Sequence, residues 1–125
     1  MTWVQPSTSN LVDLRPDLAE RIAGLSQHAG AAAPGRTGEL ARVRVHQLLV
    51  GSPPEHLPTD LTPAELAALA VIEQFIIDVH GLDDHTFAAL SNFYTPAEQM
   101  GLLFHLALLD GFTKLNLVAT DAVSE

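Results

Sequence analysis

The last half of the chain, Leu61 to Ala122, carries the clearest pattern of hydrophobic and polar positions. Its two long apolar segments open with the same tetrapeptide, Thr62-Pro63-Ala64-Glu65 and Thr95-Pro96-Ala97-Glu98. In each, the threonine can cap a helix, the proline fits the first helical position, and the glutamate can complete a capping box. Because the likeness ends after this tetrapeptide, it indicates repeated helix-start chemistry and not a duplicated domain.

These two starts predict most of the C-terminal structure. The first begins a helix that ends at Gly81, and Asp83 or Asp84 is placed to cap a short helix after it. The second begins a long helix, from Pro96 to about Ala119, whose apolar residues surround its axis. A helix that is apolar on all sides is buried on all sides. One small chain offers too few neighbours for that, so we expect a homo-oligomer.

The N-terminal half predicts further helices. Residues 1–10 are polar and expected to be flexible, ahead of a single helical domain over residues 11–122. Pro16 fits the first turn of a helix in which Leu18, Ile22 and Leu25 share one face. Residues 39–50 are ambiguous, because residues 41–46 alternate like a strand although good helix formers flank them. We interpret this segment as a helix, which gives an all-α fold of five or six helices.

Composition narrows the classes of protein. The chain has 125 residues, of which 47% are hydrophobic, and its formal net charge is −9 with scattered carboxylates, so we expect no nucleic-acid partner. It has no cysteine, which excludes disulfides, thiol redox catalysis and thiolate metal sites. The start of the chain lacks the pattern of a signal peptide, and His105, Asp110 and Lys114 interrupt the longest apolar segment. We therefore expect a cytoplasmic protein with no membrane span.

Two blocks of motifs point to a family. The first is Arg-Pro-Asp-Leu-Ala at residues 15–19 with Glu-Leu-Ala-Arg-Val-Arg-Val at residues 39–45. The second runs from the capped segment at residues 61–79, through the acidic link at residues 82–90, to the long helix with its late Asn116. Together these blocks resemble the carboxymuconolactone decarboxylase-like superfamily, which includes the AhpD-type alkylhydroperoxidases. The resemblance implies an oligomeric AhpD-like helical bundle.

The chain departs from this family at the redox motif. In the peroxidase-like members, the helix that resembles residues 39–50 leads into a Cys-x-x-Cys, whereas this chain reads Gly-Ser-Pro-Pro at residues 51–54. Glu39 alone matches an active-site residue of the family. The resemblance therefore implies an oligomeric small-ligand-binding or scaffold protein without thiol redox activity and without a cofactor. Its decarboxylase branch implies an alternative, a cofactor-independent decarboxylase, lyase or isomerase acting on a small organic acid or lactone.

The candidate catalytic residues are Glu39, His46 and His105. Glu39, Arg42 and His46 lie at helical spacings on one face, where a carboxylate beside an imidazole could act as an acid–base pair. The alternative is a solvated face with a salt bridge. His105 is either a core histidine hydrogen-bonded to a carbonyl or an ionisable group in an apolar cavity.

Other polar residues have simpler interpretations. Asp110 and Lys114 are one turn apart and can pair, and Glu73 is a buried-carboxylate candidate that can equally pair with a basic residue elsewhere. The two histidines and two aspartates of residues 80–85 fit a helix end and a helix cap better than a metal site. A cavity lined only by apolar residues would favour the scaffold, and one where a histidine and a carboxylate converge would favour the enzyme.

Overall fold

The structure is a computed structural model that describes residues 15–51 and 56–124. Within these ranges it is helical and contains no strand. The helices are α2 (Pro16–Ala32), α3 (Thr37–Leu49), α4 (Pro63–Ile77), the 3-10 turn η1 (Val79–Gly81), α5 (Asp84–Ser91) and α6 (Pro96–Ser124). The all-α class is therefore confirmed, as is the helical interpretation of residues 39–50. The prediction that residues 1–10 are flexible lies outside the described residues.

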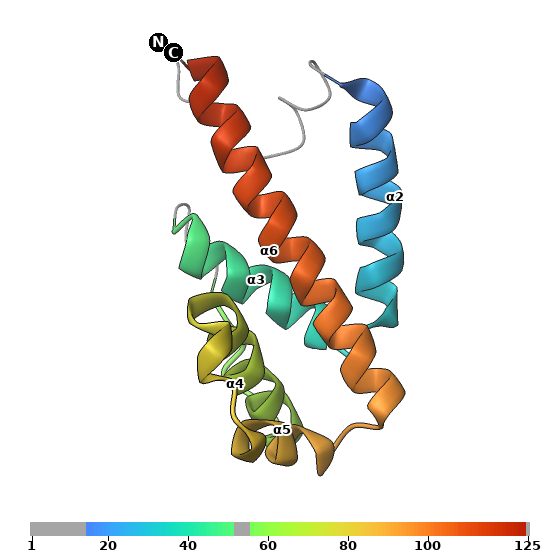
Figure 1. The fold of residues 1–125 in the computed structure, drawn as a ribbon. Coiled ribbons are helices and arrows are strands. Elements are labelled where there is room, and N and C mark those ends of the chain that lie inside the picture. The colour runs from blue at the N-terminus through green and yellow to red at the C-terminus, as the bar shows by residue number, and fades with distance from the viewer. Residues whose placement is uncertain (1–14, 52–55, 125) are drawn as a thin grey trace.

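Helix α6 is the central rod of the molecule (Figure 1). It contacts α2, α3, α4 and α5. Helix α2 packs against α6 near the start of α6, and the two helices diverge toward the other end of the molecule (Figure 1). Helix α3 also packs against α4, which places α4 and α5 at the end of the molecule where α6 begins (Figure 1). Helices α2, α3 and α6 also contact one another in pairs.

The capping chemistry places the helix starts where the sequence predicts them. The Thr62 hydroxyl accepts from the Glu65 N–H at 3.1 Å, and the Glu65 carboxylate accepts from the Thr62 N–H at 2.9 Å. Thr95 and Glu98 repeat this pair of bonds at 3.2 and 2.9 Å, and Asp83 caps α5. Helix α4 ends earlier than expected, at Ile77, because the chain is extended at the next residue and then forms η1.

The core lies where α3, α4, α5 and α6 meet. Its fully buried members are Ala41, Val45, Ala68, Val71, Ile72, Leu90, Leu102 and Leu106. Alanine and valine on α3 and α4 let the leucines of α5 and α6 enter between them. Because the core draws on helices from both halves of the chain, neither half can bury it alone.

The apolar faces predicted for α2 and α6 are only partly correct. In α2, Leu18 and Leu25 are 36% and 41% exposed, whereas Ala19 and Ala29 are buried. In α6, one side is buried but Phe104 and Val118 on another side are 48% and 66% exposed. Within one chain, α6 is therefore only partly enclosed. Enclosure by a second chain stays a prediction.

Helix α6 also has the length of a membrane span. Its segment Pro96–Val118 is the one candidate by length and composition in the part of the chain that the structure describes. It carries the ion pair between Lys114 Nζ and Asp110 Oδ1 at 2.9 Å, as its spacing predicted. An ion pair near the middle of a helix is costly to place in hydrocarbon.

Arg36 joins the start of α3 to the start of α4. Its guanidinium donates to both carboxylate oxygens of Glu65, with Nη2 at 2.9 Å from Oε1, and also to the Asp60 carboxylate. The bond from Arg36, followed by the bond from the Thr62 N–H, lowers the pKa of Glu65 from 4.5 to about 2. A carboxylate with a lowered pKa stabilises the folded state as long as it stays ionised.

This pair predicts a loss of stability in acid. The contribution of Glu65 is fully present above about pH 4.5 and is lost as the pH falls toward about 2, because the unfolded chain binds the proton first. The melting temperature, followed by circular dichroism from pH 7 to pH 2, is expected to fall less steeply in Glu65→Gln than in the wild type. Glu98→Gln, which alters the other capping box, is the control. Equal slopes for Glu65→Gln and the wild type would contradict the prediction.

Candidate functional site

A cavity of about 430 Å³, open to solvent on one side, lies between α2, α3 and α6. Its volume is in the range of small-molecule sites. Its lining comes from three helices and one turn: Ser26, Gln27, Gly30, Gly35, Arg36, Gly38, Glu39, Arg42, His105 and Leu109. The lining includes six polar or charged residues, although most of the surface that faces the cavity is apolar, so the cavity suits a small ligand with both polar and apolar parts.

Two glycines bring the walls of the cavity close together. A Cβ atom on Gly38 would lie 3.0 Å from the carbonyl oxygen of Gly30, closer than most such contacts. A Cβ atom on Gly30 would lie 3.5 Å from Cε1 of His105. The end of α2 and the start of α3 therefore meet through backbone atoms. Because neither glycine has a side chain, the His105 ring can lie against both of them.

His105 is the buried polar group of the cavity. Only 7% of it is exposed, and its Nε2 lies 3.0 Å from the Gly38 carbonyl oxygen. A carbonyl oxygen only accepts, so Nε2 carries the proton, and Nδ1 of the neutral ring carries a lone pair. Nδ1 is buried and has no hydrogen-bond partner among the described residues. The carbonyl bond that the first interpretation predicts is present, and the same residue lines a cavity, so its catalytic role stays a prediction.

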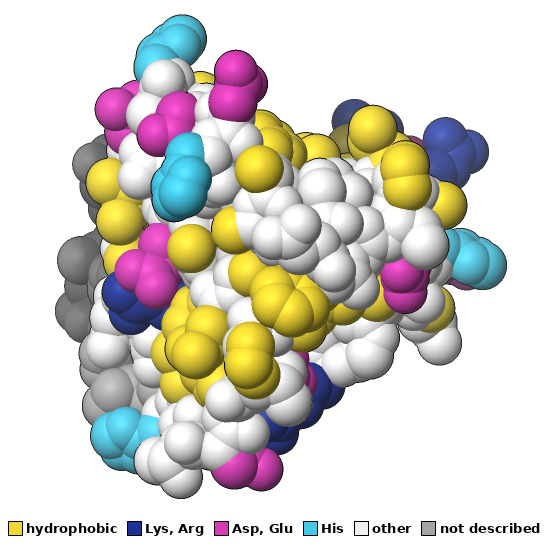
Figure 2. Space-filling model, turned by 90° about the horizontal axis from the view of Figure 1, so that it is seen from below, with side chains coloured by type: hydrophobic (Ala, Val, Ile, Leu, Met, Phe, Trp, Pro, Cys, Tyr) yellow, Lys and Arg dark blue, Asp and Glu magenta, His cyan; other side chains and the backbone are white. Residues whose placement is uncertain are grey.

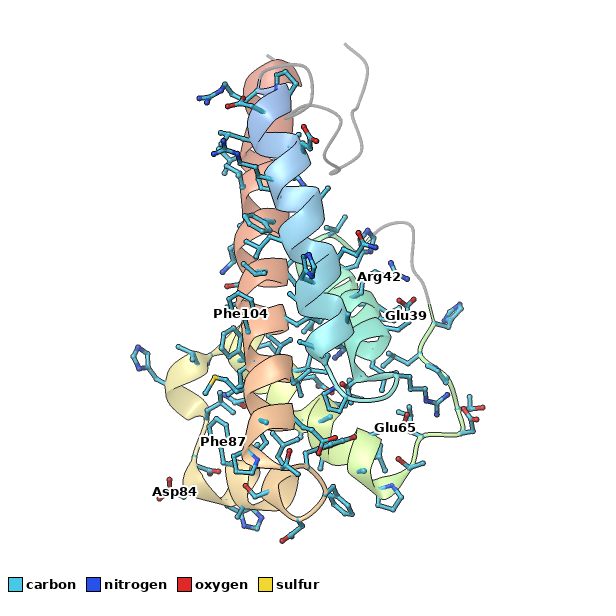
Figure 3. All side chains as sticks on the ribbon, turned by 90° about the vertical axis from the view of Figure 1, so that its right-hand side faces the viewer. Glu39, Arg42, Glu65, Asp84, Phe87 and Phe104 are labelled. Atoms are coloured by element: carbon cyan, nitrogen blue, oxygen red, sulfur yellow. The ribbon has the colours of Figure 1, made fainter. Side chains whose placement is uncertain are left out.

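Glu39 and Arg42 lie together at the mouth of this cavity (Figure 3). Arg42 Nη2 is 2.6 Å from Glu39 Oε1, and its Nε is 3.1 Å from Oε2. The Arg42 side chain is 44% exposed and the Glu39 side chain is 64% exposed. Exposed pairs of this kind contribute about 0–1 kcal/mol. The salt bridge that the spacing predicted is present.

His46 is not among the residues that line the cavity. It lies on α3 two turns after Glu39, about 10 Å farther along the helix. Its side chain is half-buried, and its Nδ1 also has no partner among the described residues. The structure therefore brings Glu39 and His105 together and leaves His46 outside their site.

The sequence did not identify Arg36 as part of the site. Arg36 lines the cavity while it holds Glu65, 29 residues away along the chain. No local spacing could show that contact, although the capping box of α4 marked Glu65 as a fixed carboxylate. Elsewhere, Glu73 pairs with Arg44 at 3.3 Å. Within residues 15–51 and 56–124, no three acidic or histidine side chains are grouped to hold a metal ion.

Comparisons with models of known protein families, with curated proteins and with solved structures gave no match to this chain. The resemblance to the carboxymuconolactone decarboxylase-like superfamily therefore stays a prediction that depends on the motifs of residues 15–45 and 61–117. The case for a function depends on the geometry of the cavity.

Proposed function

We propose that this protein is an oligomeric carboxymuconolactone decarboxylase-like protein without thiol redox activity, and that it binds a small organic acid between α2, α3 and α6. The observation that carries the proposal is His105, which lines this cavity and whose Nδ1 is buried without a partner among the described residues. Nδ1 has almost no surface open to solvent, so a ligand reaches it only when the groups around it shift. An unsatisfied buried acceptor costs about 1–3 kcal/mol. A ligand that donates a hydrogen bond to Nδ1 removes that cost.

The other polar groups define the class of ligand. Arg42 lines the same cavity, and its Nε and Nη2 already hold the Glu39 carboxylate, so a ligand carboxylate would pair with them by taking the place of Glu39. A hydroxyl group elsewhere on the ligand would donate to His105 Nδ1. A small hydroxy acid satisfies both groups at once, whereas a scaffold would need only apolar walls. The presence of Arg36, Arg42 and His105 in a lining that is otherwise mainly apolar favours ligand binding over a purely structural role.

Lactate, propionate and lactamide test this mode of binding as a matched set. The chain is labelled with ¹⁵N at its histidines, and the Nδ1 resonance of His105 is followed during titration with each compound. We expect lactate to shift this resonance at the lowest concentration, because propionate lacks the hydroxyl group and lactamide lacks the carboxylate. No shift with any of the three at tens of millimolar would contradict the proposal.

Arg42→Gln is expected to weaken lactate binding about 10- to 100-fold, the size of one charge-assisted hydrogen bond. Arg21→Gln, on the exposed surface of α2, is the control and is expected to bind as the wild type does. The comparison is made by the same titration. An equal loss in both variants would show a general charge effect, and no loss in Arg42→Gln would remove Arg42 from the site.

A second candidate function has its own supporting observation. The Gly38 carbonyl fixes the proton on Nε2, so the lone pair of Nδ1 is available to accept a proton from a ligand. This supports a cofactor-independent decarboxylase, lyase or isomerase acting on a small organic acid or lactone. In D₂O, such an enzyme would exchange the proton next to the carboxylate of a bound acid, and His105→Gln would abolish the exchange. Binding without exchange or product would exclude catalysis on the acids tested.

A further inference from the structure

A stripe of apolar residues follows one face of α6 along most of its length. It consists of Ala97, Met100, Phe104, Ala107, Gly111, Leu115 and Val118, and every member is exposed. Their spacing alternates between three and four residues, which keeps all of them within about 40° of one line along the helix. Such spacing is typical of the seam along which two helices pair.

The polar residues of α6 lie away from this stripe. Glu98, Gln99, His105, Asp110, Thr113 and Asn116 are all buried or half-buried. Helix α6 therefore buries Leu102 and Leu106 in the core and turns a second apolar face, this stripe, to solvent. Among the polar residues of 96–118, Lys114 is the exposed one. Of the 18-residue segment of high hydropathy within Pro96–Val118, only 17% is buried. Soluble monomers rarely expose a continuous apolar surface of this length.

We propose that the stripe pairs with the same stripe of a second copy of this chain, with the two α6 helices antiparallel. A two-fold axis between Ala107 and Leu108 maps six of the seven members of the stripe onto one another and sets Ala107 against Leu108 of the other copy. It sets Ala97 against Val118, Met100 against Leu115, and Phe104 against Gly111, each with its counterpart in the other copy. Self-complementarity of this kind is what a two-fold interface requires.

The contact between Phe104 and Gly111 is the central feature of this register. Phe104 is 48% exposed, and a Cβ atom on Gly111 would meet nothing within 4 Å. Each Phe104 ring would therefore cover the bare backbone at Gly111 of the other copy, once on either side of the axis. Ala107, near the axis, is small enough to let the two helices approach closely.

The charge of the stripe is compatible with a second copy as the occupant. The chain carries a formal charge of −9, so two copies repel unless the surfaces that meet are neutral. The stripe holds no charged residue, and the nearby Lys114 already pairs with its own Asp110. A lipid bilayer would require this ion pair to enter or skirt the hydrocarbon. An antiparallel pair also sets the two helix dipoles in opposition, which is favourable.

The stripe and the ligand cavity lie on different sides of α6. Figure 3 shows Phe104 on the side of α6 that faces away from Glu39 and Arg42. The pairing proposal therefore does not depend on the proposed ligand. A monomeric chain would overturn the pairing and the oligomeric part of the proposed function, and would leave the ligand-binding part intact.

Sedimentation equilibrium of the full chain tests the pairing. We expect a dimer of the 13.4-kDa chain at micromolar concentration, with Phe104→Glu raising the dissociation constant at least 100-fold. Phe93→Glu is the matched control, because Phe93 is 47% exposed but lies outside α6. It is expected to remain a dimer. A monomeric wild type, an equal effect of both variants, or a monomer that floats with phosphatidylcholine vesicles would overturn the proposal.

The absence of cysteine allows a direct test of orientation. Ala107→Cys places a thiol beside the axis, where the two copies come within the distance of a disulfide. Ala97→Cys places its two thiols roughly 30 Å apart along the helices, at about 1.5 Å per residue. Under mild oxidation we expect a covalent dimer with Ala107→Cys and none with Ala97→Cys. Cross-linking of both variants would indicate a parallel pair, and cross-linking of neither would overturn the register.

Discussion

Leu106→Ala is expected to lower the free energy of unfolding by about 2–5 kcal/mol. Leu106 is fully buried in the cluster that joins α3, α4, α5 and α6, so its truncation removes contacts that hold the two halves of the chain together. A domain of this size has only about 5–15 kcal/mol of stability. A loss of this size therefore removes a large fraction of the total.

Urea denaturation, followed by circular dichroism at 222 nm, measures this loss. Leu66→Ala is the matched control, since the same atoms are removed from a helix position that is 53% exposed. It is expected to change the free energy of unfolding by less than about 1 kcal/mol. Equal losses in the two variants would mean that the cluster around Leu106 is not the stabilising core.

The sequence predicted the helices well because their ends are encoded locally. Each capping box is formed by residues three positions apart, so the start of α4 at Pro63 and of α6 at Pro96 needed no tertiary information. The prediction for residues 39–50 succeeded for a similar reason, because good helix formers outweighed a short alternation. Helix ends and helix propensity are properties of neighbouring residues.

Burial was predicted less well because it depends on which surfaces meet. The leucines of α2 predicted an inward face, yet Ala19 and Ala29 are the buried residues of this helix. The reason is a close contact between α2 and α6, where Gly101 lies against the backbone of Ala32. Small residues determine how closely two helices approach, and hydrophobic periodicity does not report them.

In the candidate site too, contacts within one helix were predicted from the sequence and contacts between helices were not. Helical spacing correctly placed Glu39 beside Arg42 on α3, and His105 is buried and bonded to a carbonyl, as one of its two interpretations predicted. That Glu39 and His105 share a cavity, and that His46 does not, depends on how α3 crosses α6. The role of Arg36 depends on Glu65 in another helix. No spacing within one element carries that information.

The close contact at Gly101 gives the second strong prediction. A Cβ atom on Gly101 would lie 2.2 Å from the carbonyl oxygen of Ala32, and a backbone atom of a packed helix cannot move aside alone. Gly101→Ala should therefore push α2 away from α6. We expect a net loss of about 3 kcal/mol in the free energy of unfolding, because the clash outweighs the gain of about 1 kcal/mol that alanine brings within a helix.

Gly24→Ala is the matched control for this prediction, because a Cβ atom there would meet nothing within 4 Å and the residue lies in α2. It is expected to stabilise the protein by up to about 1 kcal/mol. Thermal and urea unfolding distinguish the two variants by the sign of the change. Gly101 lies one turn before His105, so Gly101→Ala should also shift the ¹⁵N resonances of that ring. A stabilised Gly101→Ala with an unchanged His105 spectrum would show that α2 and α6 are not in contact at this point, and that the cavity between them is not formed as described.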